Sequence, residues 1–328
     1  MSILHAHAIR MQRTGGPAVL EWIPVEIGEP GPGEVRLRQT AVGLNFIDVY
    51  QRTGLYSIPL PTIPGQEAAA VVETVGPGVT DLAPGDRVAY ASAPIGAYAE
   101  ARLMPAGRVV KLPAGFSDAQ AAAMMLKGMT AQYLIRRTYR VQPGDAILVH
   151  AAAGGVGTIL CQWAAHLGAT VIGTVGSDEK AAAARAHRCR HPIVYTRDDF
   201  AARVREITGG AGVAAVYDSV GRDTFDKSLE CLQPRGTMVL FGQSSGMVPP
   251  FDLSRLASRG SLFITRPSLG TYTATRDELL ATARELFAVV ETGVVKIEIN
   301  QSYPLREAAQ AHRDLEARRT TGSTVLLP

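Results

Sequence analysis

The sequence has few cysteines and no long apolar run. Of its 328 residues three are cysteines, Cys161, Cys189 and Cys231, and a small odd number spread along the chain argues against a disulfide framework. No stretch of roughly eighteen apolar residues occurs, and the first residues lack a continuous apolar signal segment. We therefore expect a cytoplasmic protein that is neither secreted nor membrane-spanning.

The chain also has little excess charge. Lys and Arg together number 33 and Asp and Glu 30, which gives a formal net charge of +3. Without a basic block, nucleic acid is not expected to be the main partner. Hydrophobic residues at 46% and charged residues at 19% are typical of a globular protein, and the length predicts two domains.

The first third of the chain is predicted to be β-rich. Short strands are cut by turns rich in glycine and proline, and they read EVRLRQTAVGL, AAAVVETV, DRVAYA and RVVKLP. From Ser117 the pattern changes to good helix formers, with Ser117 or Asp118 as the N-cap. We expect this helix to link the two domains.

From Ala146 onward, strands and helices alternate. Six short apolar strands without alternation predict a parallel sheet buried on both faces, in a doubly wound α/β arrangement. The predicted strands are AILVHA, TVIGTV, IVY, AAVYDS, TMVLFG and SLFIT. After Arg266 a helix and a last strand, STVLLP, follow a different rhythm, which suggests a return to the first domain.

The glycine-rich turn HAAAGGVG predicts a dinucleotide site. It follows a strand and opens a helix, with Gly154 and Gly157 in the last two glycine positions of the dinucleotide fingerprint and Ala152 in the first. Small residues let the backbone approach a pyrophosphate, which then lies on the amides at the helix N-terminus.

The end of the second strand favours NADP over NAD. An acidic residue at this place would bind the ribose hydroxyls of NAD, but here Gly176 and Ser177 lie at the tip and Lys180 follows one turn later. These residues suit the 2′-phosphate of NADP, which an acidic residue would repel. Asp178 is the alternative, since it can turn toward the ribose or simply favour the helix N-terminus.

Several motifs together resemble one known family. GGPAVLEW, VGLNFIDVYQRTGLY, VGPGVTDLAPGDRV, AAAMMLKGMTAQYL, VYDSVGRDTFDKSLECL, FGQSSG and TRPSLG span nearly the whole chain. They resemble the medium-chain dehydrogenase/reductase superfamily and, within it, the zinc-independent NADPH:quinone oxidoreductases related to zeta-crystallin.

The resemblance implies a fold and an assembly. It implies a GroES-like, β-rich catalytic domain from residues 1–122 and 266–328, and an NADPH-binding Rossmann domain with a six-stranded parallel sheet from residues 123–265. Nicotinamide and substrate would meet in a cleft. It also implies a homodimer, which the strand SLFIT would form by edge pairing.

The resemblance further implies an active site without zinc. Asn45 and Gln66 occupy positions that hold cysteine and histidine in zinc-dependent relatives, and neutral amides are poor zinc ligands. A second cluster, His187, Cys189 and His191, lies among arginines and is interpreted as a basic surface loop with no metal.

Quinone reduction needs donors for a developing oxyanion. The candidates are Asn45, Tyr50 and Tyr56, with Lys127 or Thr130 behind the nicotinamide; the tyrosines can instead pack structurally, and Asn45 can cap a turn. Asp48 and Glu67 are expected to support these residues. Glu67 has two candidate partners, Arg266 and Lys127, and the sequence does not choose between them.

Matching to the family also implies the cofactor contacts. Tyr195, which ends the third strand, would stack near adenine or pack as an interfacial tyrosine. The full set implied for NADPH is Asn45, Gly154, Gly155, Val156, Gly157, Ser177, Lys180, Tyr195, Ser219, Phe241, Gly242, Ser244 and Arg318.

Three functions remain open from the sequence. The first is NADPH-dependent reduction of a small quinone, by hydride or electron transfer. The second is reduction of an enone or enoyl double bond on the same fold. The third is a non-enzymatic role in binding RNA, which the basic pI near 8.8 permits only weakly.

Overall fold

The computed structural model describes residues 3–328, and the chain divides into two compact units. Unit 1 comprises Met1–Met129, of which residues 1 and 2 lie outside the described part, together with Thr273–Phe287 and Ile297–Pro328. Unit 2 comprises Thr130–Tyr272 and Ala288–Lys296. These limits lie several residues after the predicted boundaries at 122 and 266, and Ala288–Lys296, which the prediction gave to the catalytic domain, belongs to unit 2.

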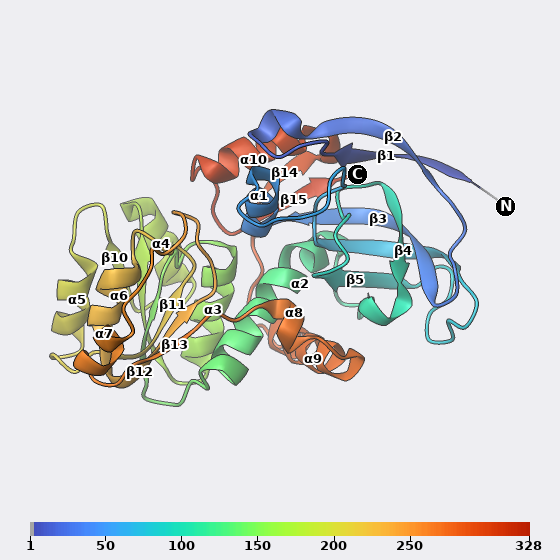
Figure 1. Ribbon diagram of the computed structural model, residues 1–328. Helices are drawn as coiled ribbons and strands as arrows, with labels where there is room; N and C mark the ends of the chain where they lie inside the picture. Colours follow the sequence, from blue (N-terminus) through green and yellow to red (C-terminus); the bar gives the residue numbers. More distant parts are fainter. Residues whose placement is uncertain (1–2) are drawn as a thin grey trace. The chain divides into compact units, whose positions relative to one another are not determined.

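The centre of unit 1 is a mainly antiparallel sheet with the strand order β14-β15-β3-β4-β5-β7, and β6 also pairs with β3 (Figure 1). β14 and β15 run parallel, and β15 pairs antiparallel with β3, so the last strand of the chain lies beside one of the first. The strands of this sheet are β3 (Glu34–Leu44), β4 (Glu67–Val75), β5 (Arg87–Ala91), β6 (Ala101–Pro105), β7 (Val110–Lys111), β14 (Ile299–Pro304) and β15 (Ser323–Leu327).

Several elements of unit 1 were missed from the sequence, among them β6, β14 and the helix Ala308–Glu316. β1 (Leu4–Arg10) and β2 (Glu21–Ile27) form an antiparallel hairpin. The segment after β3 forms a helix, α1 (Phe46–Thr53), which ends at Gly54 with a φ of 84°. β-branched and aromatic residues obscured this helix, although an Asn N-cap and a C-terminal glycine are ordinary helix signals.

The helix predicted from Ser117 is α2 (Asp118–Tyr133), and the Ser117 hydroxyl accepts a hydrogen bond from Gln120 N at 3.1 Å. Within unit 1 this helix contacts α9 (Arg276–Glu291) so closely that a Cβ on Gly128 would lie 2.4 Å from Leu286 Cδ1. The remaining helix is α10 (Ala308–Glu316). The glycine thus permits close packing of α2.

Unit 2 is doubly wound, as predicted. In the described chain its sheet has six parallel strands in the order β10-β9-β8-β11-β12-β13 (Figure 1). β11 is buried along its whole length, which explains its continuous apolar sequence. The strands are β8 (Ala146–Val149), β9 (Thr170–Val175), β10 (His191–Val194), β11 (Val213–Asp218), β12 (Leu232–Leu240) and β13 (Phe263–Thr265).

Helices connect these strands. Phe200 of α5 and Phe225 of α6 pack with Ile172 and Val216 of the sheet in one apolar core. The helices are α3 (Gly155–His166), α4 (Asp178–Ala186), α5 (Phe200–Ile207), α6 (Phe225–Cys231), α7 (Ser254–Ser258) and α8 (Leu269–Tyr272). Among residues 3–328, no helix has the length and apolar character needed to cross a bilayer.

Candidate active site

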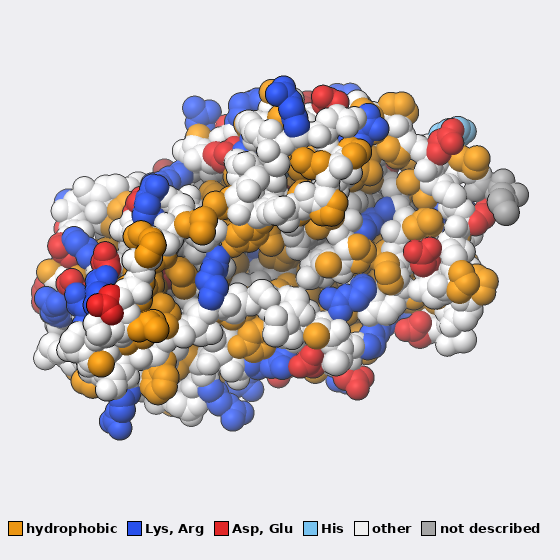
Figure 2. Space-filling view, in the orientation of Figure 1, with side chains coloured by type: hydrophobic (Ala, Val, Ile, Leu, Met, Phe, Trp, Pro, Cys, Tyr) orange, Lys and Arg blue, Asp and Glu red, His pale blue; other side chains and the backbone are white. Residues whose placement is uncertain are grey.

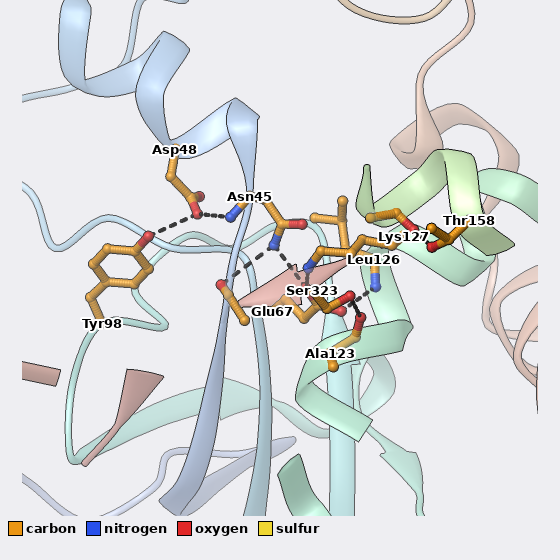
Figure 3. A network of polar contacts seen from close by, with 11 residues as sticks. Asn45, Asp48, Glu67, Tyr98, Ala123, Leu126, Lys127, Thr158 and Ser323 are labelled. Carbon is orange, nitrogen blue, oxygen red and sulfur yellow. Dashed lines mark hydrogen bonds and ion pairs between the residues drawn. The ribbon is translucent and has the colours of Figure 1, made fainter. Parts of the chain in front are cut away.

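The buried carboxylate of Glu67 organises a polar cluster in unit 1 (Figure 3). Glu67 is the first residue of β4 and is 0% exposed. Its Oε2 accepts hydrogen bonds from Asn45 Nδ2 at 2.8 Å and from Lys127 Nζ at 3.0 Å, and its Oε1 accepts from Leu126 N at 2.7 Å. The partner is therefore Lys127, while Arg266 donates to the Leu240 carbonyl at 2.9 Å.

A glycine in the neighbouring strand makes room for this carboxylate. A Cβ on Gly43 of β3 would lie 2.2 Å from Glu67 Oε2 and 2.2 Å from the Ala122 carbonyl oxygen. No real Cβ approaches that closely, so a glycine is required here. The neighbouring strand β3 and the helix α2 therefore pack directly against the Glu67 carboxylate.

Asn45 lies directly before α1 and joins this cluster. Its backbone N–H donates to Asp48 Oδ2 at 2.9 Å, which caps the helix, while its side-chain nitrogen is directed toward Glu67 (Figure 3). Gln66, next to Glu67, is buried and makes no side-chain hydrogen bond among residues 3–328. Two neutral amides and one ion pair therefore meet at this end of the sheet.

A second buried network begins at Asp48. Its Oδ2 also accepts from the Tyr98 hydroxyl at 3.0 Å, and Tyr98 Oη lies 3.0 Å from His312 Nε2 on α10. Burial raises the pKa of Asp48 to about 7, and burial, with the nearby Arg52, lowers the pKa of His312 to about 3. Tyr98, His312 and Arg52 could not be identified from the sequence, because their contacts join distant segments.

Asp48 makes stability depend on pH in a defined direction. The folded chain holds its proton up to about pH 7, whereas the unfolded chain loses it near the ordinary value of 3.8. This contribution to stability is present in full below the unfolded pKa and is lost as pH rises through about 7. As the pH rises from 5 to 8, the free energy of unfolding of Asp48→Asn, measured with urea, should therefore rise relative to that of the parent protein. The same dependence on pH in both proteins would contradict the raised pKa of Asp48.

The two tyrosines predicted as donors lie together on and after α1. The rings of Tyr50 and Tyr56 are 5.0 Å apart, and Tyr56 N donates to the Tyr50 carbonyl at 3.0 Å. Tyr50 is buried and Tyr56 half-buried. Thr130 lies on α2 one turn beyond Lys127, at the first position of unit 2, and is buried.

In the glycine-rich turn of unit 2, backbone segments lie so close together that a side chain has no room at Gly157. A Cβ on Gly157 would lie 2.3 Å from the Ala151 carbonyl oxygen and 2.8 Å from Ala152 Cα. Gly154 is the N-cap of α3, and Gly155 and Val156 form its first turn, only partly buried. The turn therefore presents helix N-terminal amides, the arrangement that binds a pyrophosphate.

The end of β9 places a serine, a lysine and a tyrosine near one another. Ser177 caps α4, accepting from Lys180 N at 3.2 Å. Asp178 is held by Arg197 at 3.2 Å, which reduces its negative field. Exposed Tyr195 lies beside this tip, since a Cβ on Gly176 would be 3.2 Å from its hydroxyl. This set suits a phosphate better than a ribose hydroxyl.

The remaining predicted cofactor residues fall into two places. Ser219, Phe241, Gly242 and Ser244 meet where β11 and β12 end; Ser244 N donates to the Ser219 carbonyl at 3.1 Å, and a Cβ on Gly242 would collide with Ser219 at 2.7 Å. Arg318 belongs to unit 1, after α10, and is exposed with a φ of 58°.

The surface-loop interpretation of the second histidine cluster was wrong for two side chains. His187 and Cys189 are buried, and only the arginines between and after them are exposed. Cys189 packs against the sheet, since a Cβ on Gly173 would lie 2.7 Å from its Sγ. Alternation along this segment directs the neutral side chains inward.

Comparisons with known proteins define the class. Residues 31–114 match the alcohol dehydrogenase GroES-like domain, and residues 188–326 match a zinc-binding dehydrogenase. With the doubly wound sheet and its glycine turn, these matches define an oxidoreductase of the medium-chain dehydrogenase/reductase superfamily.

The particular family follows from the relatives. The chain is 53% identical over 324 residues to the quinone oxidoreductase of Pseudomonas aeruginosa, covering 98% of this chain and 100% of the relative. It is 51% identical to the 2-haloacrylate reductase of a Burkholderia species, covering 97% and 98%. The solved structure of Escherichia coli quinone oxidoreductase complexed with NADPH has a TM-score of 0.97 at 48% identity, covering 98% and 100%. The chain belongs to the quinone oxidoreductase family, as its motifs predicted.

The zinc that one family description implies does not fit these residues. Among residues 3–328 no group of three or more His, Cys, Asp or Glu side chains is arranged to hold a metal ion. At the predicted site Asn45 and Gln66 are neutral amides, and Glu67 already pairs with the Lys127 ammonium. Neutral amides are poor zinc ligands, and the Lys127 ammonium beside the one carboxylate would repel the ion.

Proposed function

We propose that this chain is an NADPH:quinone oxidoreductase that works without a metal. The observation that carries the proposal is the buried Asn45, Glu67 and Lys127 cluster, in a chain about half identical to quinone oxidoreductases over nearly its whole length. The Lys127 ammonium can orient a carbonyl acceptor and stabilise negative charge on it.

We propose that NADPH is the cofactor, supplying a hydride or an electron from its nicotinamide ring. The glycine turn at Gly154 and Gly157 would hold the pyrophosphate on the N-terminus of α3. Ser177 and Lys180 would hold the 2′-phosphate, with Tyr195 against the adenine. The further contacts proposed are Asn45, Gly155, Val156, Ser219, Phe241, Gly242, Ser244 and Arg318.

The acceptor side of the site is proposed to be formed by residues of α1 and α2 and of the segment after α1. Lys127 is the strongest donor, since an ammonium carries three hydrogens and only one is directed at Glu67. Tyr50, Tyr56 and Thr130 are the proposed hydroxyl donors. Together they would hold the oxygen of a quinone on which negative charge develops.

The experiment that tests this function is oxidation of NADPH with two kinds of acceptor in parallel. The relative named 2-haloacrylate reductase makes an activated double bond the second candidate substrate. We expect a higher kcat/KM with 1,4-benzoquinone than with 2-chloroacrylate or a cyclic enone. Faster reduction of the double bond would make this chain an enone reductase, and no oxidation with either would reject the proposal.

Lys180→Ala should raise the KM for NADPH about tenfold, equivalent to roughly 1.4 kcal/mol, because an ammonium at the 2′-phosphate is lost. The KM for NADH, which lacks that phosphate, should not change. Lys227→Ala is the matched control, an exposed lysine of unit 2 that pairs with Asp199. An unchanged KM for NADPH, or a parent protein that prefers NADH, would remove the NADP assignment.

We propose that the protein is a homodimer joined through β13. This strand is at the edge of the unit 2 sheet, where its backbone groups are open to pairing with a second copy. Phe263 is 61% exposed and Ile264 is 36% exposed on this strand, and a second chain would bury them. Met247 and Leu253 are also exposed apolar residues of unit 2.

Phe263→Asp should therefore convert the dimer into a monomer, because a charge would be buried in the paired edge. Light scattering after gel filtration measures the mass directly. Leu60→Asp, at an exposed leucine of unit 1, is the control and should leave the mass unchanged. A parent protein that is already monomeric, or a dimeric Phe263 variant, would count against this interface.

We also propose a cytoplasmic location and no nucleic-acid partner. All three cysteines are free and buried, which suits a reducing compartment. On the face drawn in Figure 2, basic and acidic side chains are interspersed rather than gathered into a basic stripe.

A further inference from the structure

We propose that Glu67 is a positioning residue that decides which end of the Asn45 amide faces the ligand. By this assignment Asn45 presents its carbonyl oxygen, a hydrogen-bond acceptor, and so recognises a donor group. The ligand group of that kind is the carboxamide NH₂ of the nicotinamide, so the inference rests on NADPH as the cofactor.

The argument begins with the chemistry of Glu67. An ionised carboxylate can only accept hydrogen bonds, and three donors are directed at this one. One of these donors is the Lys127 ammonium, 3.0 Å from Glu67 Oε2. If Asn45 turned its amide over, its Oδ1 would face Glu67 Oε2 at hydrogen-bond distance, and two acceptors would repel.

The other contact of the Asn45 amide agrees with this orientation. Its Nδ2 also lies 3.4 Å from the Gly43 carbonyl oxygen, a second acceptor on the same side. Gly43 is the residue whose missing side chain lets Glu67 approach β3. Both amide hydrogens of Asn45 are thus directed toward protein acceptors within unit 1.

The carbonyl oxygen of Asn45 is left for a ligand. Among residues 3–328 it accepts no hydrogen bond, and it is not among the enclosed polar atoms, whereas Asp48 Oδ1 is. An acceptor at this place would repel a developing oxyanion. The expectation that Asn45 donates to the quinone oxygen is therefore replaced, and that task falls to Lys127 and the hydroxyl donors.

A cofactor analogue separates these roles. Reduced 3-acetylpyridine adenine dinucleotide phosphate keeps the carbonyl of NADPH but has a methyl group where the carboxamide has NH₂. We expect the parent protein to bind it about tenfold more weakly than NADPH, measured by calorimetry, because one hydrogen bond is lost. The readout is binding, so it does not depend on turnover.

The variant is Glu67→Gln. A glutamine offers one acceptor oxygen and one NH₂ in place of two acceptors, so Asn45 can turn and present its own NH₂. Discrimination against the analogue should fall below about threefold. Glu73→Gln is the matched control, the same substitution on the same strand at a residue that pairs with Arg36 and Arg38. It should keep the parent discrimination.

The outcomes distinguish this inference from the proposed function. No binding of NADPH by the parent protein would reject the function, whereas equal binding of both cofactors would reject only the role of Asn45. Full discrimination in a folded Glu67→Gln variant would reject the role of Glu67. If that variant does not fold, the side-chain NH₂ signals of Asn45 in ¹⁵N-labelled parent protein decide: protection from solvent exchange without ligand supports the contact with Glu67, and rapid exchange rejects it.

Discussion

Lys127→Met should lower the free energy of unfolding of unit 1 by about 3–5 kcal/mol, because it leaves the Glu67 carboxylate buried without its cation. Glu67 is 0% exposed, and its side chain and that of Lys127 meet at 3.0 Å. Methionine keeps most of the lysine stem and removes the ammonium, with its charge and its hydrogen bond to Glu67. The chain has two tryptophans, Trp22 and Trp163, so fluorescence of Trp22 in a Trp163→Phe background follows urea unfolding of unit 1.

Two further variants make this result specific. Lys111→Met removes a lysine that pairs with Asp86 at 2.9 Å but is 56% exposed, and it should cost at most about 1 kcal/mol. Combining Lys127→Met with Glu67→Gln removes both charges and should recover part of the loss. Equal losses of unfolding free energy in Lys127→Met and Lys111→Met would show that the buried pair with Glu67 stabilises the fold no more than an exposed pair does.

Gly157→Ala should weaken the binding of NADPH about 100-fold, or roughly 2.7 kcal/mol. The new Cβ would lie 2.3 Å from the Ala151 carbonyl oxygen and 2.8 Å from Ala152 Cα. Both are backbone atoms, which no change of rotamer can move away. The turn must shift, and the amides at the N-terminus of α3 shift with it. Calorimetric titration with NADPH measures the loss.

Gly107→Ala is the control for this substitution, since a Cβ there meets nothing within 4 Å. Gly154→Ala should have an intermediate effect, because its nearest atom, the Ala151 carbonyl oxygen, is 3.2 Å away. Equal affinities for all three variants would show that this turn does not hold the cofactor.

Much of unit 2 follows from local sequence. Each of its parallel strands is a short apolar run, and the glycine turn lies between a strand and a helix, so periodicity and turn chemistry agree. The contacts that refine the site are not local. Asp178 was ambiguous because its partner, Arg197, follows the next strand, and nothing in the sequence sets their distance of 3.2 Å.

Unit 1 was less predictable, and the reason is its topology. Asn45, Glu67 and Lys127 come from three separate elements, and only their pairing in space gives Glu67 its partner. The motifs identified the residues but not their roles. The polarity of the Asn45 amide depends on a carboxylate 22 positions away, and local patterns do not specify such contacts.

The most direct test of the account is oxidation of NADPH by 1,4-benzoquinone, with protein that has been treated with a chelator and whose zinc content has been measured. The Lys127 ammonium beside Glu67 predicts full activity with well below one zinc per chain. Loss of activity on chelation with recovery on adding zinc would contradict the account.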